Sequence, residues 1–220
     1  MTQIETELQL LKKEVINMWD LVRSQMLKAK SSMLNFDKDL AREVVLKERR
    51  VNGSELKIDR DCENIFALLT PVAVDLRFVL AVLKINSNLE RIGDIAEGIA
   101  KYMIDVDAPF KRELLEETYV TKMFDESINI LEDTLNAFEN EDTILARSVF
   151  KKDEFLDDIN IRANELIEDY LKNNPSDLNQ ALYILSVIRK LERVGDQSKN
   201  ISEEIIFYLE AKVLKHKHSH

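Results

Sequence analysis

Two copies of one short segment constrain the fold of this chain more than any other feature. The segment LERIGDIAEGI begins at Leu89, and LERVGDQSKNI begins at Leu191. Both copies read Leu-Glu-Arg, then an aliphatic residue, then Gly-Asp, so the six aligned positions differ only by Ile for Val. A repeat of this kind indicates that one structural unit is duplicated within the chain.

Residues that break helices are scarce. The 220 residues include only 4 glycines and 3 prolines, and the breaks are confined to short segments such as NFD, DVDAP and NNPSD. Asp37 is expected to cap the second helix, and Thr70 followed by Pro71 is expected to open the third. The pattern predicts six long helices, at 3–34, 37–69, 71–104, 109–139, 142–173 and 176–214.

The positions of the repeat predict the architecture. The third and sixth helices each follow a proline and each carry one copy of the segment. We therefore expect an all-α fold, a tandem repeat of two antiparallel three-helix bundles related by a pseudo-two-fold axis. The predicted boundaries are 1–106 for the first repeat, 107–214 for the second and 215–220 for a flexible tail that holds all three histidines, His216, His218 and His220.

Charge and composition exclude several classes of protein. The formal net charge is −10, and no basic block offsets it, which argues against nucleic acid as a partner. The N-terminus is acidic and amphipathic rather than a signal peptide, and no apolar run approaches the roughly 20 residues that span a bilayer. The single cysteine, Cys62, fits a reducing compartment. We expect a soluble, cytoplasmic protein with no direct insertion into the membrane.

Carboxylates of the repeated segment share one helix face. Glu90 and Asp94 are four residues apart, so their side chains project together, away from the apolar stripe of the same helix. In the second copy Glu192 and Asp196 have this spacing, and Asn200 continues their row by one turn. The apolar stripes are Ile85, Leu89, Ile92, Ala96 and Ile99 in the first copy, and Val187, Leu191, Val194, Ile201 and Ile205 in the second.

The second and fifth helices carry similar pairs. Glu48 and Asn52 stand four apart beside one apolar face, and Asp153 and Asp157 stand four apart beside the other. Two facing pairs would form an oxygen-rich site for a cation, and the mid-helix glycine of each repeated segment would allow close approach. The alternative is a set of solvated acid rows balanced by neighbouring arginines.

The doubled segment resembles the PhoU family of bacterial regulators of phosphate uptake. NLERIGDIAEGIA and KLERVGDQSKNIS are similar to the family's paired E-R-x-G-D-x-x-x-N segments, and the resemblance covers nearly the whole chain. It implies metal clusters on the bundle surface and a non-enzymatic role that restrains phosphate import and phosphate-starvation signalling. The implied partners are the ATPase subunit of the phosphate ABC transporter and the phosphate-sensing histidine kinase, at the cytoplasmic side of the inner membrane. A homodimer is also expected.

Carried over by residue, the resemblance assigns metal ligands in both repeats. The second repeat has the full set, Asp153, Asp157, Glu192, Asp196 and Asn200. The first has Glu48, Asn52, Glu90 and Asp94, with Glu48 where the family usually has Asp and Gly98 where it usually has Asn. Glu97 is expected to supply the missing oxygen, and the turn-forming pair Asn52-Gly53 predicts a local distortion of the helix. Iron or zinc is favoured, and Mg, Mn or Ca remain open.

Other functions are less favoured. A ferritin-like di-iron enzyme needs Glu-x-x-His on its helices, and every histidine here lies in the final HKHSH. The same distribution excludes the usual histidine-assisted nucleophiles, and no phosphate-binding glycine loop is present, so no enzyme is expected. Two alternatives remain, a helical adaptor without metal and an accessory protein of a different phosphate permease, coupled to protons or sodium.

Overall fold

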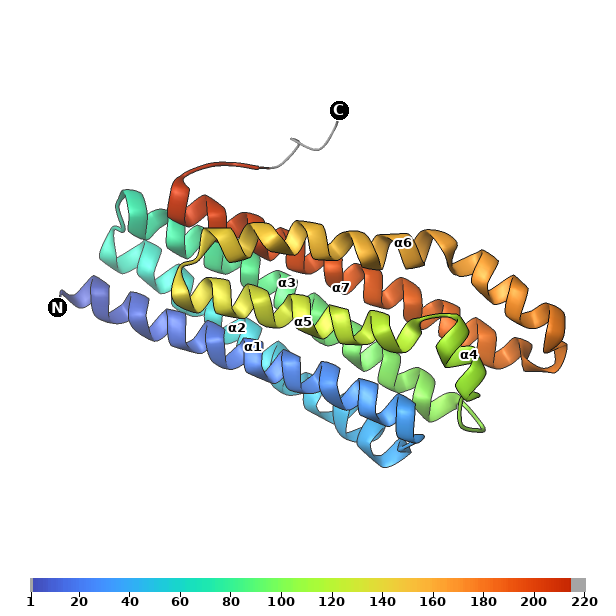
Figure 1. The fold of residues 1–220 in the computed structure, drawn as a ribbon. Helices are drawn as coiled ribbons and strands as arrows, with labels where there is room; N and C mark the ends of the chain where they lie inside the picture. The colour runs from blue at the N-terminus through green and yellow to red at the C-terminus, as the bar shows by residue number, and fades with distance from the viewer. Residues whose placement is uncertain (1, 215–220) are drawn as a thin grey trace.

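The computed structural model describes residues 2–214; the predicted tail at 215–220 lies outside the described residues. Within that range the protein is all-α, and its long helices run side by side as a rod (Figure 1). The helices are α1 (Gln3–Asn35), α2 (Lys38–Leu69), α3 (Ala73–Asp105), α4 (Arg112–Glu117), α5 (Val120–Asn140), α6 (Thr143–Asn173) and α7 (Leu178–Glu210), with a 3₁₀ turn, η1 (Pro175–Asp177), before the last.

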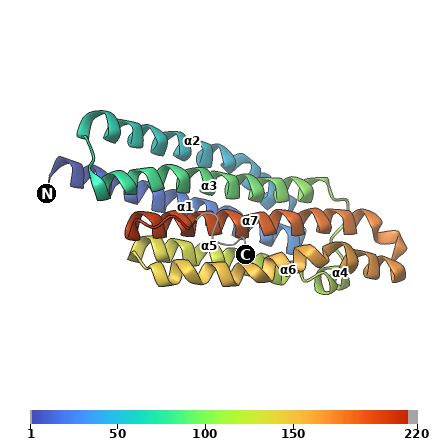
Figure 2. The ribbon, with the colours of Figure 1, turned by 90° about the horizontal axis from the view of Figure 1, so that it is seen from above.

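The predicted pair of three-helix bundles is confirmed. Helices α1, α2 and α3 pack together, as do α5, α6 and α7, and the two bundles meet where α3 packs on α7 and α1 on α5. Figure 2 shows α3 and α7 next to each other along the middle of the molecule, with α2 and α6 toward opposite sides. The two helices that carry the repeated segment are therefore central, and each has an outer helix packed against it.

The helix boundaries confirm one predicted cap and correct another. Oδ1 of Asp37 accepts hydrogen bonds from the backbone N–H groups of Asp39 and Leu40, as an N-cap does. Thr70 was expected to cap α3, but it ends α2 in a left-handed conformation with φ of 47°, and α3 starts only at Ala73. The prediction for Thr70 was wrong because the chain needs a left-handed residue to leave α2, and that geometry is incompatible with the extended backbone of an N-cap.

The predicted fourth helix is interrupted. Residues expected to form a single helix at 109–139 form α4 and α5, and Tyr119, with φ of 57°, lies between them. The hydroxyl of Thr118 donates to the carbonyl of Leu114 at 2.6 Å, which satisfies a carbonyl at the end of α4. After Pro109, residues 110–140 contain neither glycine nor proline, so the usual signals of a break are missing.

The distortion predicted at Asn52-Gly53 does not interrupt α2. The helix is continuous through these residues, and Val51 and Ile58 on either side are buried. Burial of this apolar face holds the turn-forming pair in the helix, since tertiary packing outweighs a local preference of about 1 kcal/mol.

Both predicted apolar stripes are buried, so the helical faces were assigned correctly. Every member of the two stripes is at most 1% exposed. The bundles also share a core: the rings of Trp19 and Phe138 lie 5.4 Å apart, and the Trp19 indole N–H donates to the carbonyl of Leu131. Across residues 2–214, none of the helices combines the length and the apolar character needed to cross a membrane.

Candidate functional site

The first acidic face is formed where α2 crosses the repeated segment of α3. Glu48 of α2 is only 5% exposed and lies over Gly93 of α3, where an added Cβ would come within 3.3 Å of its Oε2. Among the residues that the structure describes, neither oxygen of Glu48 has a hydrogen-bond partner. A buried carboxylate without a donor is costly when ionised, so the structure leaves the charged form of Glu48 uncompensated.

Neighbouring acids make the environment of Glu48 more negative. Burial, followed by the charges of Asp94 and Glu97, raises the pKa of Glu48 to about 7. Burial and the charge of Asp94 also raise the pKa of Glu90. Asp94 is exposed, and Glu97 is half-buried and pairs with Lys101 at 2.6 Å. The charges of Glu90, Asp94 and Glu97 all act on Glu48, so the four acids share one electrostatic environment. Their role as metal ligands stays a prediction.

Asn52 contributes less than expected to this face. It is exposed, one turn beyond the buried Glu48 on α2. Gly98, which was noted as the departure from the family pattern, lies under Lys190 of α7, and an added Cβ would come within 2.5 Å of the lysine Nζ. The missing asparagine side chain therefore leaves space for a lysine from the other bundle.

The second acidic face is built in the same way but contains a lysine. Asp153 of α6 is 1% exposed and lies over Gly195 of α7, where an added Cβ would be 2.0 Å from its Oδ1. Lys199 forms an ion pair with Oδ2 of Asp153, and its Nζ lies 2.9 Å from Asp196 and 3.9 Å from Asp157. One ammonium group therefore faces three carboxylates.

The lysine changes the electrostatics of the second face. Burial raises the pKa of Asp153 to about 6, although the Lys199 ammonium opposes the shift. Burial disfavours the charged form of Lys199, but its hydrogen bonds to Asp153 and Asp196 hold the lysine pKa above its usual value. Oδ1 of Asp153 has no hydrogen-bond partner among the described residues, so the compensation is incomplete.

The other two predicted ligands of the second half, Glu192 and Asn200, lie in different environments. Glu192 stays with the acidic face, where burial and then Asp196 raise its pKa. Asn200 instead donates from Nδ2 to Oδ1 of Asn88, at 3.4 Å, and so contributes to the contact between α7 and α3. As the side chains stand in residues 2–214, no three His, Cys, Asp or Glu gather closely enough to hold a metal ion.

Sequence analysis missed two properties of these faces. The first is the near-complete burial of Glu48 and Asp153, which depends on how closely the outer helices approach the glycines of the inner ones. The second is Lys199, whose position three residues after Asp196, on the same helix face, was a signal available in the sequence.

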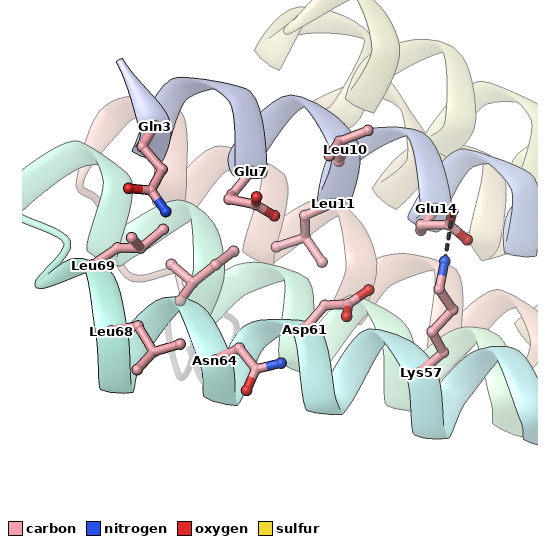
Figure 3. A pocket seen from close by; sticks show the side chains of 11 residues that line it. Gln3, Glu7, Leu10, Leu11, Glu14, Lys57, Asp61, Asn64, Leu68 and Leu69 are labelled. Carbon is pink, nitrogen blue, oxygen red and sulfur yellow. Dashed lines mark ion pairs between the residues drawn. The ribbon is translucent and has the colours of Figure 1, made fainter.

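A groove of about 520 Å³ lies elsewhere, between α1 and α2 (Figure 3). Its wall includes Glu7 and Asp61, and Glu14 pairs across it with Lys57 at 2.7 Å. A second cleft, between α3 and α7, is lined by basic side chains from both, among them Arg91, Lys190 and Arg193. Neither groove includes the buried Glu48 or Asp153, but Asp94 and Glu97 of the first acidic face line the second cleft beside these basic side chains.

Comparison with known proteins gives a consistent result over most of the chain. The family described as PhoU domain matches twice, at residues 15–103 and 120–205. The phosphate-specific transport system accessory protein PhoU of Edwardsiella tarda is 32% identical over 214 residues, which cover 97% of this chain and 87% of that protein. The protein of the same name from Escherichia coli (strain K12) is 30% identical, with coverage of 97% and 88%.

Solved structures agree with the sequence relatives. The crystal structure of PhoU from Pseudomonas aeruginosa superposes with a TM-score of 0.86 at 29% identity, covering 96% of this chain and 100% of that one. The phosphate transport system regulatory protein PhoU from Streptococcus pneumoniae gives a TM-score of 0.85 at 27% identity, with coverage of 96% and 99%.

Proposed function

Because the chain belongs to the PhoU family, we propose that it restrains phosphate import by an ABC transporter and damps phosphate-starvation signalling through a two-component system. The family consists of accessory and regulatory proteins and not of enzymes. The observation that carries the proposal is the match of both halves to one domain family, over nearly the full length of relatives named for the phosphate-specific transport system. The proposed partners are the transporter's ATPase subunit and the phosphate-sensing histidine kinase.

The acidic faces are the proposed metal-binding surfaces, with iron or zinc as the favoured metal. The buried, unpartnered carboxylate of Glu48 supports a cation in the first half, where Glu90, Asp94 and Glu97 would share in holding it. A cation there would supply the charge that these acids lack. The arrangement of the second half fits a metal less well, because the Lys199 ammonium already lies among the carboxylates.

The proposed site of action is the cytoplasmic side of the inner membrane, reached through protein partners. A formal net charge of −10 opposes direct adhesion to anionic lipid. Family likeness and large exposed apolar side chains support a homodimer as the working form. Three of these side chains are Leu46, Ile144 and Ile161.

A bacterium that lacks the gene tests the regulatory role. In phosphate-replete medium the deletion strain should express a phosphate-starvation reporter that the wild-type gene represses again. The protein should also co-purify with the ATPase subunit and the histidine kinase. Unchanged reporter expression after deletion would contradict the proposal, and co-purification with a proton- or sodium-coupled permease alone would favour the alternative transporter.

Metal removal separates the metal-binding protein from a metal-independent adaptor. The Tm of the metal-binding protein should fall when a chelator removes the ion, since a ligand that binds only the folded state stabilises it. The Tm of an adaptor should not respond to chelator. Because regulation and metal binding are measured separately, either part of the proposal can fail alone.

A further inference from the structure

The two halves differ at the position three residues after the motif aspartate. From Asp94 this position is Glu97, and from Asp196 it is Lys199. At this position the halves therefore differ by two charge units. Both halves share one arrangement, in which a buried carboxylate of the outer helix lies over a glycine of the inner helix. The first half also has Gly98 where the second has Asn200, and Lys190 of α7 lies over Gly98 without being a hydrogen-bond partner of Glu48.

The contacts of Lys199 are those of a bound cation. Its Nζ pairs with Asp153 and Asp196 and lies within 4 Å of Asp157, so it reaches carboxylates of both α6 and α7. In the first half Glu97 adds a further acid, and its partner Lys101 is a largely exposed residue of the same helix. The carboxylate of Glu48 has no partner of its own among the described residues.

We propose that Lys199 is a built-in cation that takes the place of a bound metal in the second half. An ion entering among Asp153, Asp157 and Asp196 would have to displace the ammonium group or approach it against like-charge repulsion. As a consequence that rests on the proposed function, metal binds in the first half alone. In this proposal the acids of the first half are compensated by a bound metal ion, and those of the second half by the ammonium group of Lys199.

The experiment uses the full chain with His216→Ala, His218→Ala and His220→Ala, so that the terminal histidines cannot bind the probe. Each protein is stripped with chelator, and its Tm is measured with chelator and then with Zn²⁺. Zinc content is measured after gel filtration. The variants are Glu48→Gln, Asp153→Asn, Lys199→Met and Lys199→Glu, and Lys172→Met serves as a control for loss of an exposed, paired lysine.

In chelator, Lys199→Met should lower the Tm by about 5–10 °C, because the buried carboxylate of Asp153 loses its partner, while Lys172→Met should change it by less than about 2 °C. Lys199→Glu should also lower the Tm in chelator, and Zn²⁺ should restore it. Its zinc content should exceed that of the parent, because the second half then has the acid that the first half has. In the parent, Glu48→Gln should abolish bound zinc and Asp153→Asn should leave it unchanged.

Two outcomes would overturn the proposal. One is a zinc content that falls with Asp153→Asn as much as with Glu48→Gln. The other is a Lys199→Met protein whose Tm in chelator equals that of the parent. If the parent binds no zinc at all, zinc is ruled out as the metal of the proposed function, and the role of Lys199 is still decided by the Tm of Lys199→Met in chelator.

Discussion

Glu48 and Asp153 occupy equivalent positions, yet their charges are compensated differently. Each lies over a helical glycine and is at least nine-tenths buried, but only Asp153 has a basic side chain as its partner. Ionising a buried carboxylate is unfavourable unless a cation or a set of donors faces it. At the scale of single residues, the first half should therefore be the more sensitive to pH and to added cations.

We predict that Glu48→Gln alters the pH dependence of stability in metal-free buffer. The pKa of Glu48 is raised from 4.5 to about 7, so between these values the folded state keeps a proton that the unfolded state releases. The stabilisation from Glu48 is present below the unfolded-state pKa and is lost as the pH rises toward the folded-state value. The Tm of Glu48→Gln relative to wild type should therefore rise by a few degrees between about pH 5 and about pH 8.

The control for this experiment is Glu63→Gln, which removes an exposed glutamate from the same helix. Its Tm should stay parallel to that of wild type across the pH range. A Glu48→Gln profile that is also parallel to wild type would show that the carboxyl group of Glu48 is compensated in solution.

Alanine substitutions at three glycines should change the free energy of unfolding in different directions. Gly195→Ala would place a Cβ 2.0 Å from Oδ1 of Asp153 and 2.8 Å from Leu156, so it should destabilise by about 1–3 kcal/mol. Gly53→Ala meets nothing within 4 Å in a helix interior and should stabilise by about 0.5–1 kcal/mol. Gly93→Ala, with its closest contact at 3.0 Å, should fall between them. Urea denaturation of the three proteins measures the order, and equal effects would contradict it.

At the scale of elements, the two outer helices, α2 and α6, begin with the same N-cap. Oδ1 of Asp142 accepts from the N–H groups of Ile144 and Leu145, as Asp37 does at the start of α2. The duplication thus preserved the start of each outer helix. The buried carboxylate follows the capping aspartate by 11 residues in both outer helices, from Asp37 to Glu48 and from Asp142 to Asp153.

We predict that Asp37→Ala and Asp142→Ala each cost about 1 kcal/mol of folding free energy, since each leaves two backbone N–H groups without their acceptor. Thr70→Ala should be nearly neutral, because Thr70 ends α2 and does not cap α3. Thr70→Gly should be stabilising, because glycine adopts the left-handed backbone without strain. Chemical denaturation gives all four values, and a loss of about 1 kcal/mol in Thr70→Ala would restore the cap assignment.

At the scale of the whole molecule, the bundles share aromatic and apolar contacts and should unfold together. Trp19 is the only tryptophan, and it belongs to the first bundle while its ring packs on Phe138 of the second. Separation of the bundles would expose this indole as well as the apolar contact between α3 and α7. The aromatic cluster continues from Phe138 to Phe78 and Tyr208, and so includes α3 and α7.

We predict a single cooperative transition in which Trp19 fluorescence and far-UV circular dichroism change at the same urea concentration. Two separated transitions would show that one bundle remains folded after the other has lost its structure. A Phe138→Ala protein, which removes the ring against Trp19, should unfold at lower urea concentration by either probe.

Much of this protein was predictable from local signals. Helical spacing identified residues such as Leu89 and Leu191 as core, and the doubled segment identified two three-helix units, because periodicity and repetition are properties of the chain itself. Asp37 was recognised as a cap because its residue type and its place before a helical pattern are also local features of the chain. Tyr119 was missed because it adopts a left-handed backbone at a position without glycine or proline, the residues that usually signal such a break.

The sequence by itself determined the number of repeats, the helix faces and the row of acids on each inner helix. Only the tertiary structure decided which acids are buried and what faces them. Burial of Glu48 and Asp153 depends on the approach of one helix to the bare Cα of another, and the pairing of Lys199 depends on carboxylates from two helices. The charge of a side chain follows from its residue type, but its energetic consequence follows from solvation and neighbours, which the fold alone assembles.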